Sequence, residues 1–461
     1  MGSKWTKTKL KDLGKIVTGK TPSSKINEPF SSKGVLFVTP RDMKGQRWIV
    51  QTERYLSDEG LKAVKNSFIP KDSIAVSCIG SDMGKTNLIK SDSVTNQQIN
   101  SIIVDKSKHD PLFIYYSLSL KQEYFKSIAS GSATPILNKN DFGECEIYIP
   151  SKESQITISS FLDVLDSKVE INNKINQTLE QMSQTLFKSW FVDFDPVIDN
   201  ALDAGNPIPE ALQSRAELRQ KVRNNADFKP LPADIRALFP AEFEETELGC
   251  IPKGWNIDNV GRLSENIFSG GTPNTSTEEY WNGALNWFSS GETRNAIIIE
   301  TEKKITEAGV KNSSTRLSVS GDILIASAGQ GHTRGQTSLN TIDTYINQSV
   351  VCIRPMKSYY SSWLYFNISS RYEEMRAISD SHSIRGSLTT KLIASMKVIS
   401  PTDNLISLFD TSCSTFIRKM RNNLQLSCEL KKLRDTLLPK LISGELSLED
   451  LPNLVAQTEP A

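Results

Sequence analysis

The segment GSDMGKT (80–86) is the nearest match in the sequence to a nucleotide-binding motif. A phosphate-binding loop reads G-x-x-x-x-G-K followed by Ser or Thr, because backbone N–H groups and the lysine surround the phosphates. Ile79 stands where the first glycine is needed, so the segment is one residue short. A related segment, GQGHTRGQT (329–337), has Gln336 in place of Lys85. The pair favours a variable contact loop over a nucleotide site.

Other catalytic groups are sparse. The six cysteines never form a C-x-x-C pair, and only His109, His332 and His382 could join them as metal ligands. An adenine methyltransferase needs a Pro-Pro-aromatic loop to hold the flipped base, and the sequence has no Pro-Pro pair. The Glu244–Glu245 pair lies in an acidic stretch and reads as a solvated run. We therefore expect no catalytic residue, no metal site and no cofactor in this chain.

Length and charge set the broad class. A chain of 461 residues with 38% hydrophobic and 23% charged residues is expected to form two or three globular domains. No apolar run is long enough to span a membrane, and we expect a cytoplasmic protein. Residues 1–150 hold 22 Lys and Arg against 15 Asp and Glu, whereas residues 195–250 hold 6 against 11. The basic first third suits phosphate contact and the acidic stretch does not.

The elements that must position the polar loops occur twice, about 250 residues apart. KIVTGKTPSS after Trp5 is matched by NIFSGGTPNTS after Trp255, and TNQQINSIIV is matched by INQSVVCIRP. IPKDSIAVSCIG is matched by LSVSGDILIASAG in an alignment that pairs Asp72 with Asp322 and Ser77 with Ser327. Short β-type runs between Gly, Ser, Asn and Asp clusters predict a compact mixed α/β module in each copy.

A long helix is predicted after each module, beyond Pro150 and Pro401. Positions spaced by three and four residues predict a coiled-coil seam on each helix, and a helix of about 35 residues would be about 50 Å long. The first seam is Leu165, Val169, Asn172, Ile175, Leu179, Met182 and Leu186, and adding 251 gives Phe416, Met420, Asn423, Leu426, Leu430, Leu433 and Leu437. The matched Asn172 and Asn423 suggest that the two helices pair with each other. Because each module connects closely to its helix and the whole unit is duplicated, we expect a pseudo-two-fold arrangement with antiparallel helices and the modules at opposite ends.

The predicted organisation has six parts: a first module (1–150), a helical region (151–195), a connector without module-like strands (196–250), a second module (251–401), a second helical region (402–446) and a tail (447–461). Trp190, Phe191 and Phe194, at the end of the first helix, are expected in a core rather than on a docking surface.

These features resemble the specificity subunits of Type I restriction-modification systems. The segments SWFVDFDPV, ELGCIPKGW and LKKLRDTLLPKLISGEL look like characteristic segments of that family, and the resemblance covers nearly the whole chain. It implies two target-recognition domains that each read one part of a split site on double-stranded DNA. It also implies a helical pair that sets the gap and docks two methyltransferase (M) subunits, with restriction (R) subunits joining the complex. Methyl donor, ATP and magnesium would then be bound by those partners.

Candidate base-contacting residues follow from side-chain chemistry, since Arg and Lys suit guanine and Asn and Gln suit adenine. They are Lys20, Arg41, Lys85, Asn96 and Gln97 in the first module, and Arg294, His332, Arg334, Gln336, Asn347 and Gln348 in the second. The Asn–Gln pair recurs in both copies and favours a shared turn, so Lys85 and Arg334 are the better candidates for target reading. Two alternatives stay open: a self-contained methyltransferase or nuclease with divergent motifs, and a scaffold with paired binding modules that does not bind DNA.

Overall fold

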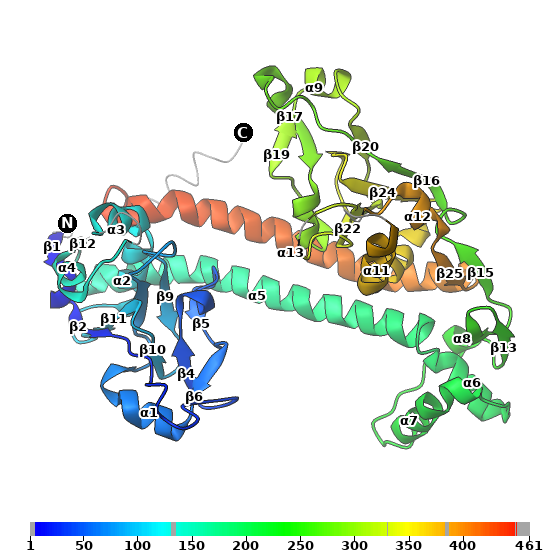
Figure 1. Ribbon diagram of the computed structural model, residues 1–461, viewed down its shortest axis with the longest axis horizontal. Helices are drawn as coiled ribbons and strands as arrows, with labels where there is room; N and C mark the ends of the chain where they lie inside the picture. The colour runs from blue at the N-terminus through cyan, green and yellow to red at the C-terminus, as the bar shows by residue number, and fades with distance from the viewer. Residues whose placement is uncertain (1–4, 131–134, 330, 383–386, 448, 450–461) are drawn as a thin grey trace. The chain divides into compact units, whose positions relative to one another are not determined.

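The computed structural model describes residues 5–130, 135–329, 331–382, 387–447 and 449 (Figure 1). The chain divides into two compact units, which are treated separately below. Unit 1 comprises residues 1–169 and 428–461, and unit 2 comprises residues 170–427. Apart from residues 447 and 449, the predicted tail lies outside the described residues.

Unit 1 contains the first module, built on two mixed five-stranded sheets. The first sheet has the order β2-β11-β8-β9-β5, the second β3-β6-β4-β10-β7, and β1 pairs with β12. Ile74 and Val76 of β8 enter one apolar cluster, while Ala75 between them enters another, as the alternation of a strand buried on both faces requires. The strands are β1 (Thr6–Lys9), β2 (Gly14–Thr18), β3 (Phe30–Ser31), β4 (Val35–Val38), β5 (Trp48–Ile49), β6 (Arg54–Leu56), β7 (Phe68–Ile69), β8 (Ile74–Ser77), β9 (Thr86–Ile89), β10 (Ser93–Thr95), β11 (Ile99–Val104) and β12 (Glu146–Ile149).

Short helices complete this module. Three α-helices begin at side chains that accept hydrogen bonds from free N–H groups of the first turn: Ser57 for α1, Asp110 for α2 and Asn138 for α4. The α-helices are α1 (Asp58–Val64), α2 (Pro111–Ser119), α3 (Gln122–Ile128) and α4 (Lys139–Glu144), and the 3-10 helices are η1 (Leu10–Asp12), η2 (Pro40–Asp42) and η3 (Lys65–Ser67).

Unit 2 contains a second module of the same design. Its sheets have the orders β16-β24-β21-β22-β18 and β19-β17-β23-β20, and β15 pairs with β25. The strands are β15 (Asn256–Asn259), β16 (Ser264–Ser269), β17 (Trp281–Phe288), β18 (Ile297–Ile298), β19 (Lys303–Ile305), β20 (Arg316–Ser318), β21 (Ile323–Ala326), β22 (Thr337–Asn340), β23 (Thr344–Ile346), β24 (Val350–Pro355) and β25 (Lys397–Ser400). The helices are η5 (Glu278–Tyr280), η6 (Ser290–Arg294), α9 (Glu307–Lys311), η7 (Ser358–Tyr360), α10 (Ser361–Ser369), α11 (Tyr372–His382) and α12 (Thr390–Ser395).

The strand register corrects one part of the sequence alignment. Cys78 donates its backbone N–H to the residue after the Asn–Gln turn, and Ser327 does the same in the second copy. Ser77 is therefore equivalent to Ala326, and Asp72 to Gly321, instead of the expected Ser327 and Asp322. Asp72 and Gly321 both have left-handed φ values, +65° and +97°. The shift of one residue matters because it exchanges the two faces of a strand.

Two long helices confirm the expected helical regions. Helix α5 (Lys152–Phe191) has 40 residues and α13 (Asp403–Ser443) has 41, so each is about 60 Å long at about 1.5 Å per residue. Both are longer than expected. Each helix contributes one part to unit 1 and the other part to unit 2.

The connector of unit 2 is more ordered than expected. It contains α6 (Asp195–Ala204), η4 (Glu210–Leu212), α7 (Gln213–Arg223), α8 (Ala233–Arg236) and a hairpin of β13 (Phe243–Thr246) and β14 (Gly249–Pro252). This hairpin is a separate two-stranded sheet, and the expectation that the connector lacks module-like strands did not foresee it. Trp190, Phe191 and Phe194 are buried in the core of unit 2, as expected.

Candidate nucleic-acid interface

In unit 1, a carboxylate holds the loop that follows β4. Asp42 accepts hydrogen bonds from the backbone N–H of Thr39 at 2.8 Å and from its hydroxyl at 2.7 Å. Its other oxygen accepts the backbone N–H of Glu53 at 2.9 Å. One side chain therefore joins two loop segments, and this arrangement fixes the short helix that presents the exposed Arg41.

The same device recurs after β17 in unit 2. Glu292 accepts hydrogen bonds from the backbone N–H of Ser289 at 2.9 Å and from the backbone N–H of Glu302 at 2.8 Å. Burial raises the pKa of the Glu292 carboxyl, while these hydrogen bonds oppose the rise. Arg294, on this loop, is exposed and forms an ion pair with Glu302. The two carboxylates were missed in the sequence, although the patterns T-x-x-D and S-x-x-E recur at an offset of 250 residues.

The repeated Asn–Gln pairs form turns in both copies. The side chain of Asn96 accepts the backbone N–H of Gln98 at 3.1 Å, and Asn347 accepts that of Ser349 at 3.0 Å. Gln97 accepts a hydrogen bond from Thr21 at 2.7 Å, and Gln348 accepts one from Thr272. These contacts favour the shared-turn interpretation, since both amide side chains hold the neighbouring Thr-Pro loop.

A close backbone approach explains the glycine before each Thr-Pro loop. A Cβ atom at Gly19 would lie 2.0 Å from the carbonyl oxygen of Asn96, and one at Gly270 would lie 1.8 Å from that of Ile346. Only glycine fits at such distances. The side chain of Lys20, next in the chain, is exposed beside this turn.

The loops 78–85 and 327–336 each join two antiparallel strands, β8 to β9 and β21 to β22. A phosphate-binding loop joins a strand to a helix, so this geometry agrees with a contact loop. Lys85 is half-buried and forms an ion pair with Asp82 at 2.6 Å. Arg334 is buried, with 8% of its surface exposed, and forms an ion pair with Asp380. That burial favours a role for Arg334 in fixing the loop.

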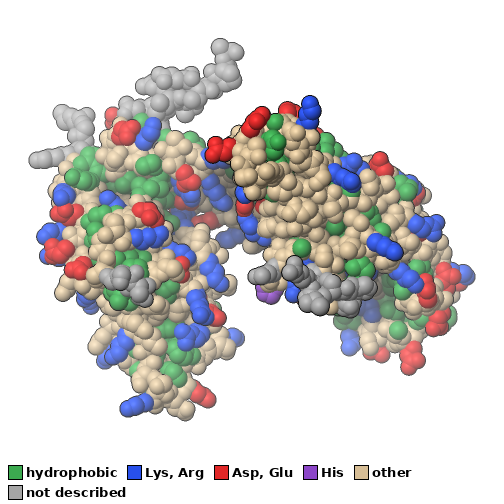
Figure 2. Space-filling model, turned by 45° about the horizontal axis from the view of Figure 1, so that its top comes forward, with side chains coloured by type: hydrophobic (Ala, Val, Ile, Leu, Met, Phe, Trp, Pro, Cys, Tyr) green, Lys and Arg blue, Asp and Glu red, His purple; other side chains and the backbone are tan. Residues whose placement is uncertain are grey.

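The other two candidates on loop 327–336, His332 and Gln336, differ in exposure. His332 is exposed, and its carbonyl oxygen accepts a hydrogen bond from the Tyr372 hydroxyl at 2.9 Å. Gln336 is half-buried and accepts one from the Thr293 hydroxyl at 3.4 Å. Lys and Arg side chains lie among Asp and Glu on the face drawn in Figure 2. The exposed basic candidates Lys20, Arg41 and Arg294 lie outside the sheets, in a loop and in two short 3-10 helices.

The matched asparagines lie in a polar layer between α5 and α13 of unit 2. Asn172 donates hydrogen bonds to the Ser427 hydroxyl at 3.1 Å and to the Asn423 carbonyl at 3.4 Å. Asn423 donates to the side chain of Asn176 at 2.8 Å, and Asn176 donates to the Met420 carbonyl at 3.2 Å. Since adding 251 to 172 and 176 gives 423 and 427, the layer has internal two-fold symmetry. Along α5 from Asn172 to Asn176, the contacted residues on α13 run backwards from Ser427 to Asn423 and Met420, so the helices are antiparallel, as expected.

Four of the predicted seam positions are wrong. Ile175, Met182, Leu426 and Leu433 are exposed by 37%, 47%, 38% and 46%. After each matched asparagine the next residue between the helices is four positions on instead of three: the half-buried Asn176 on α5 and the buried Ser427 on α13. Further along α5, Ser183 is buried instead of Met182. Polar side chains that find hydrogen bonds take the buried positions, and the apolar residues beside them remain on the surface. The other predicted seam residues are buried or half-buried: Leu165, Val169, Asn172, Leu179, Leu186, Phe416, Met420, Asn423, Leu430 and Leu437.

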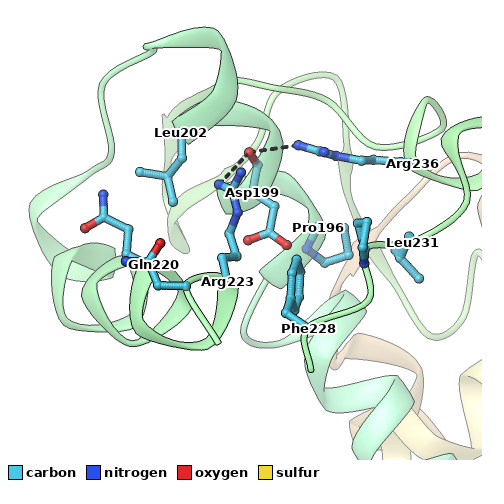
Figure 3. Close-up of a pocket in the computed structure, with 10 residues that line it drawn as sticks. Pro196, Asp199, Leu202, Gln220, Arg223, Phe228, Leu231 and Arg236 are labelled. Atoms are coloured by element: carbon cyan, nitrogen blue, oxygen red, sulfur yellow. Dashed lines mark hydrogen bonds between the residues drawn. The ribbon is translucent and has the colours of Figure 1, made fainter. Parts of the chain in front are cut away.

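The connector of unit 2 is held by a ladder of ion pairs. Asp195, Asp199 and Asp203 on α6 face Arg215, Arg219 and Arg223 on α7, each pair at a separation of 20 residues. Arg223 and Arg236 also donate to the Asp199 carbonyl oxygen, at 3.4 and 3.0 Å (Figure 3). They line a cavity of about 550 Å³. The arginines of the connector are thus engaged with its own carboxylates.

Within the described ranges, no three His, Cys, Asp or Glu residues gather in a group that could hold a metal ion. The same ranges contain no helix with the length and hydropathy of a membrane span.

Together these features define a protein with two copies of one α/β recognition module, each carrying its own polar loops, and two long helices. The family model described as "Type I restriction modification DNA specificity domain" matches residues 2–181 and 252–404. The chain therefore belongs to the Type I restriction-modification DNA specificity family.

Curated relatives agree with this assignment, and one solved structure has a similar fold. The chain is 25% identical over 455 residues to the specificity subunit of the Type I restriction enzyme MjaIX of Methanocaldococcus jannaschii, which covers 97% of this chain and 94% of that protein. It is 28% identical over 356 residues to the HindI specificity subunit of Haemophilus influenzae, covering 73% and 77% of the two chains. The fold is similar to that of the S subunit of a Type I restriction-modification system from M. genitalium, with a TM-score of 0.59, 17% identity and coverage of 95% and 96%.

Proposed function

We propose that this protein is the DNA specificity subunit of a Type I restriction-modification complex and that each module reads one part of a split, asymmetric target. The observation that carries the proposal is a shared scaffold with different side chains at equivalent loop positions. Lys20, Arg41 and Lys85 of the first module correspond to Gly271, Gly291 and Gln336 of the second. Two readers of one design with different contact groups suit a target with two different parts.

The exposed apolar residues of the long helices suit the docking of M subunits. Ile175 and Met182 on α5 correspond to Leu426 and Leu433 on α13 at an offset of 251, so each helix carries the same pair. Exposed apolar residues at helical spacing are typical of a surface that packs against a partner helix. Two M subunits would each bind one of the equivalent sites, and R subunits would join through the complex.

Catalysis and its cofactors belong, in this proposal, to the partner subunits. The methyl donor, ATP and magnesium would bind there, and the chain itself would contribute no catalytic residue. The assembled complex would act in the cytoplasm on double-stranded DNA.

Co-expression with the M subunit tests the proposal. We expect methylated adenines in one split, asymmetric motif across the host genome. Replacing residues 1–150 with the corresponding module of another family member should change one part of the motif and leave the other unchanged. A change in both parts would contradict the division between modules. Methyl transfer or cleavage by the purified chain alone would instead support a self-contained enzyme.

The docking surface has its own test. Met182→Glu and Leu433→Glu should each lower the number of bound M subunits from two to one, measured by native mass spectrometry, because a charge in an apolar contact is costly. Gln177→Glu is the matched control, since Gln177 is exposed on another side of α5. Unchanged stoichiometry in both glutamate variants would refute this surface.

A further inference from the structure

A buried ionic cluster joins the first module to both long helices within unit 1. Arg47, just before β5, donates hydrogen bonds to Asp163 of α5 at 2.5 Å and to the Tyr116 hydroxyl at 3.2 Å. Tyr116 of α2 donates to Asp166 of α5 at 2.7 Å. Arg434 of α13 donates to the other oxygen of Asp166 at 2.5 Å. The module and the two helices therefore meet at one network, which we call the Arg47 cluster.

The charges of the Arg47 cluster balance, because two arginines face two aspartates. The side chains of Arg47 and Asp166 are only 6% and 10% exposed, and that of Arg434 is 26% exposed. Burial, followed by the charge of Asp166, raises the pKa of Tyr116, so its hydroxyl stays a donor. A buried charge is tolerated when it is paired and hydrogen-bonded, as each is here.

The second module lacks its side of this cluster. Leu88 donates its backbone N–H to Arg47, and the equivalent Leu339 donates to Ala296, so Arg47 is replaced by alanine. Ser119 donates to the Tyr116 carbonyl and Ser369 to that of Phe366. The hydroxyl of Tyr116 is therefore lost as well.

The helices lack their side of it too. At the offset of 251, Asp163 becomes Ser414, Asp166 becomes Ile417 and Arg434 becomes Ser183. Ile417 and Ser183 are buried in unit 2. In place of ions, Phe366 packs against Phe187 and Phe409, with ring centroids 6.1 Å apart in both pairs. All five members of the cluster are thus exchanged together between the two copies.

We propose that the Arg47 cluster is a position-specific lock, which confines the first module to the helix surface formed by Asp163, Asp166 and Arg434. If the first module were placed where the second module lies, its Arg47 would be buried without Asp163 and Asp166. A cavity of about 830 Å³ lies beside Ala296 and Phe366, and Glu180 is the acidic residue that lines it. Burial already raises the pKa of the Glu180 carboxyl, so its charged form is disfavoured there. At the positions equivalent to Arg47 and Tyr116 the second module has Ala296 and Phe366, whose side chains carry no charge.

Because of the lock, placing the first module at the second position should cost more stability than placing the second module at the first position. A chain with the first module at both positions should melt roughly 10 °C lower than the natural chain, because Arg47 of its second copy is buried without its aspartates. A chain with the second module at both positions should melt closer to the natural chain, because Asp166 keeps Arg434 and Asp163 is 40% exposed to water. Both are made as full chains, with residues 1–150 in place of 251–401 or the reverse.

Two rescue variants keep the test decisive if the doubled chain fails to fold. Arg47→Ala with Tyr116→Phe, made only in the second copy of the first module, reproduces the docking side chains of the second module. Ser183→Arg with Ser414→Asp and Ile417→Asp instead supplies the missing side of the lock on the helices. Each set should restore most of the lost melting temperature, and Glu180→Gln in the unrescued chain should not.

Target reading gives the functional measurement, which rests on the proposed function. Co-expressed with the M subunit, the rescued chain should methylate a symmetric split motif made of the first half-site twice. If the natural chain methylates no split motif, the proposed function fails, while the melting temperatures still test the lock. The lock is overturned if the doubled first module melts with the natural chain, or if neither rescue set restores its stability.

Discussion

Phe409 joins the second module to the long helices, and Phe409→Ala is the sharpest test of how unit 2 holds its module. Its side chain is fully buried on α13. The ring centroids of Phe187, Trp190, Phe191 and Phe366 lie 6.0, 6.2, 5.1 and 6.1 Å from its own. It is therefore the shared member of an aromatic cluster that draws on α5, α10 and α13.

The expected loss of stability follows from this packing. Replacing a buried Phe by Ala costs about 3–5 kcal/mol, and each aromatic pair adds about 0.5–1.5 kcal/mol beyond the area it buries. With four aromatic partners we expect the upper end, about 5 kcal/mol. Since about 1 kcal/mol shifts the melting temperature of a domain of this size by roughly 2–4 °C, the transition of unit 2 should fall by roughly 10–20 °C. Phe409→Leu keeps most of the volume and should cost less than half as much.

Thermal unfolding followed by calorimetry measures these shifts, and hydrogen exchange assigns the transition to unit 2. Val192→Ala is the matched control, because Val192 is 49% exposed and should change stability by less than about 0.5 kcal/mol. The reasoning is refuted if Phe409→Ala lowers the melting temperature no more than the control, or if Phe409→Leu is as damaging as Phe409→Ala.

Three further expectations concern charge and the polar layer. The hydrogen bond from Lys357, above all, lowers the pKa of Asp403 in the folded chain below its usual 3.8, so the ionised carboxylate stabilises the fold above that pH and this stabilisation is lost as pH falls through the folded pKa. Asp403→Asn should therefore weaken the decline of melting temperature below about pH 4. An unchanged dependence of melting temperature on acid pH would argue against this contribution. Asp199→Ala should cost about 3 kcal/mol in urea unfolding, because it leaves the largely buried Arg219 with only the more distant carboxylate of Asp195, 3.8 Å away. A loss below about 1 kcal/mol would show that the ladder contributes little. Asn172→Leu combined with Asn423→Leu should raise the melting temperature, because the buried polar layer fixes the pairing of the helices at a cost in stability. The double variant should also self-associate, as measured by analytical sedimentation. A double variant that stays monomeric would count against a role of the polar layer in fixing helix pairing.

Much of the architecture followed from repetition in the sequence. Matched runs about 250 residues apart predicted two modules of one fold. The matched Asn172 and Asn423 predicted that the helices pair, and duplication of the whole module-plus-helix unit predicted that they are antiparallel. The prediction failed where several patterns were equally good locally. An alignment of Asp72 with Asp322 matches two identical residues, but the hydrogen bonds of the strands equate Asp72 with Gly321, because a left-handed turn is needed at that point.

The seam shows the same limit. Apolar character placed Ile175 and Met182 inside, whereas the structure buries Ser183 and half-buries Asn176. A short polar side chain can be buried when a neighbouring helix offers a partner, and sequence spacing does not reveal that partner. The candidate reading residues were chosen by chemistry alone, which could not distinguish the buried, ion-paired Arg334 from the exposed Arg41.

The sequence by itself determined the duplicated design: two α/β modules, a long helix after each, and polar loops that differ between the copies. These features are local or repeated, so hydrophobic periodicity and turn residues suffice to specify them. The tertiary structure alone decided which polar side chains are buried and what they touch. The polar layer and the Arg47 cluster depend on groups far apart in the chain. Their contact energies arise only when folding brings those groups together and removes them from water.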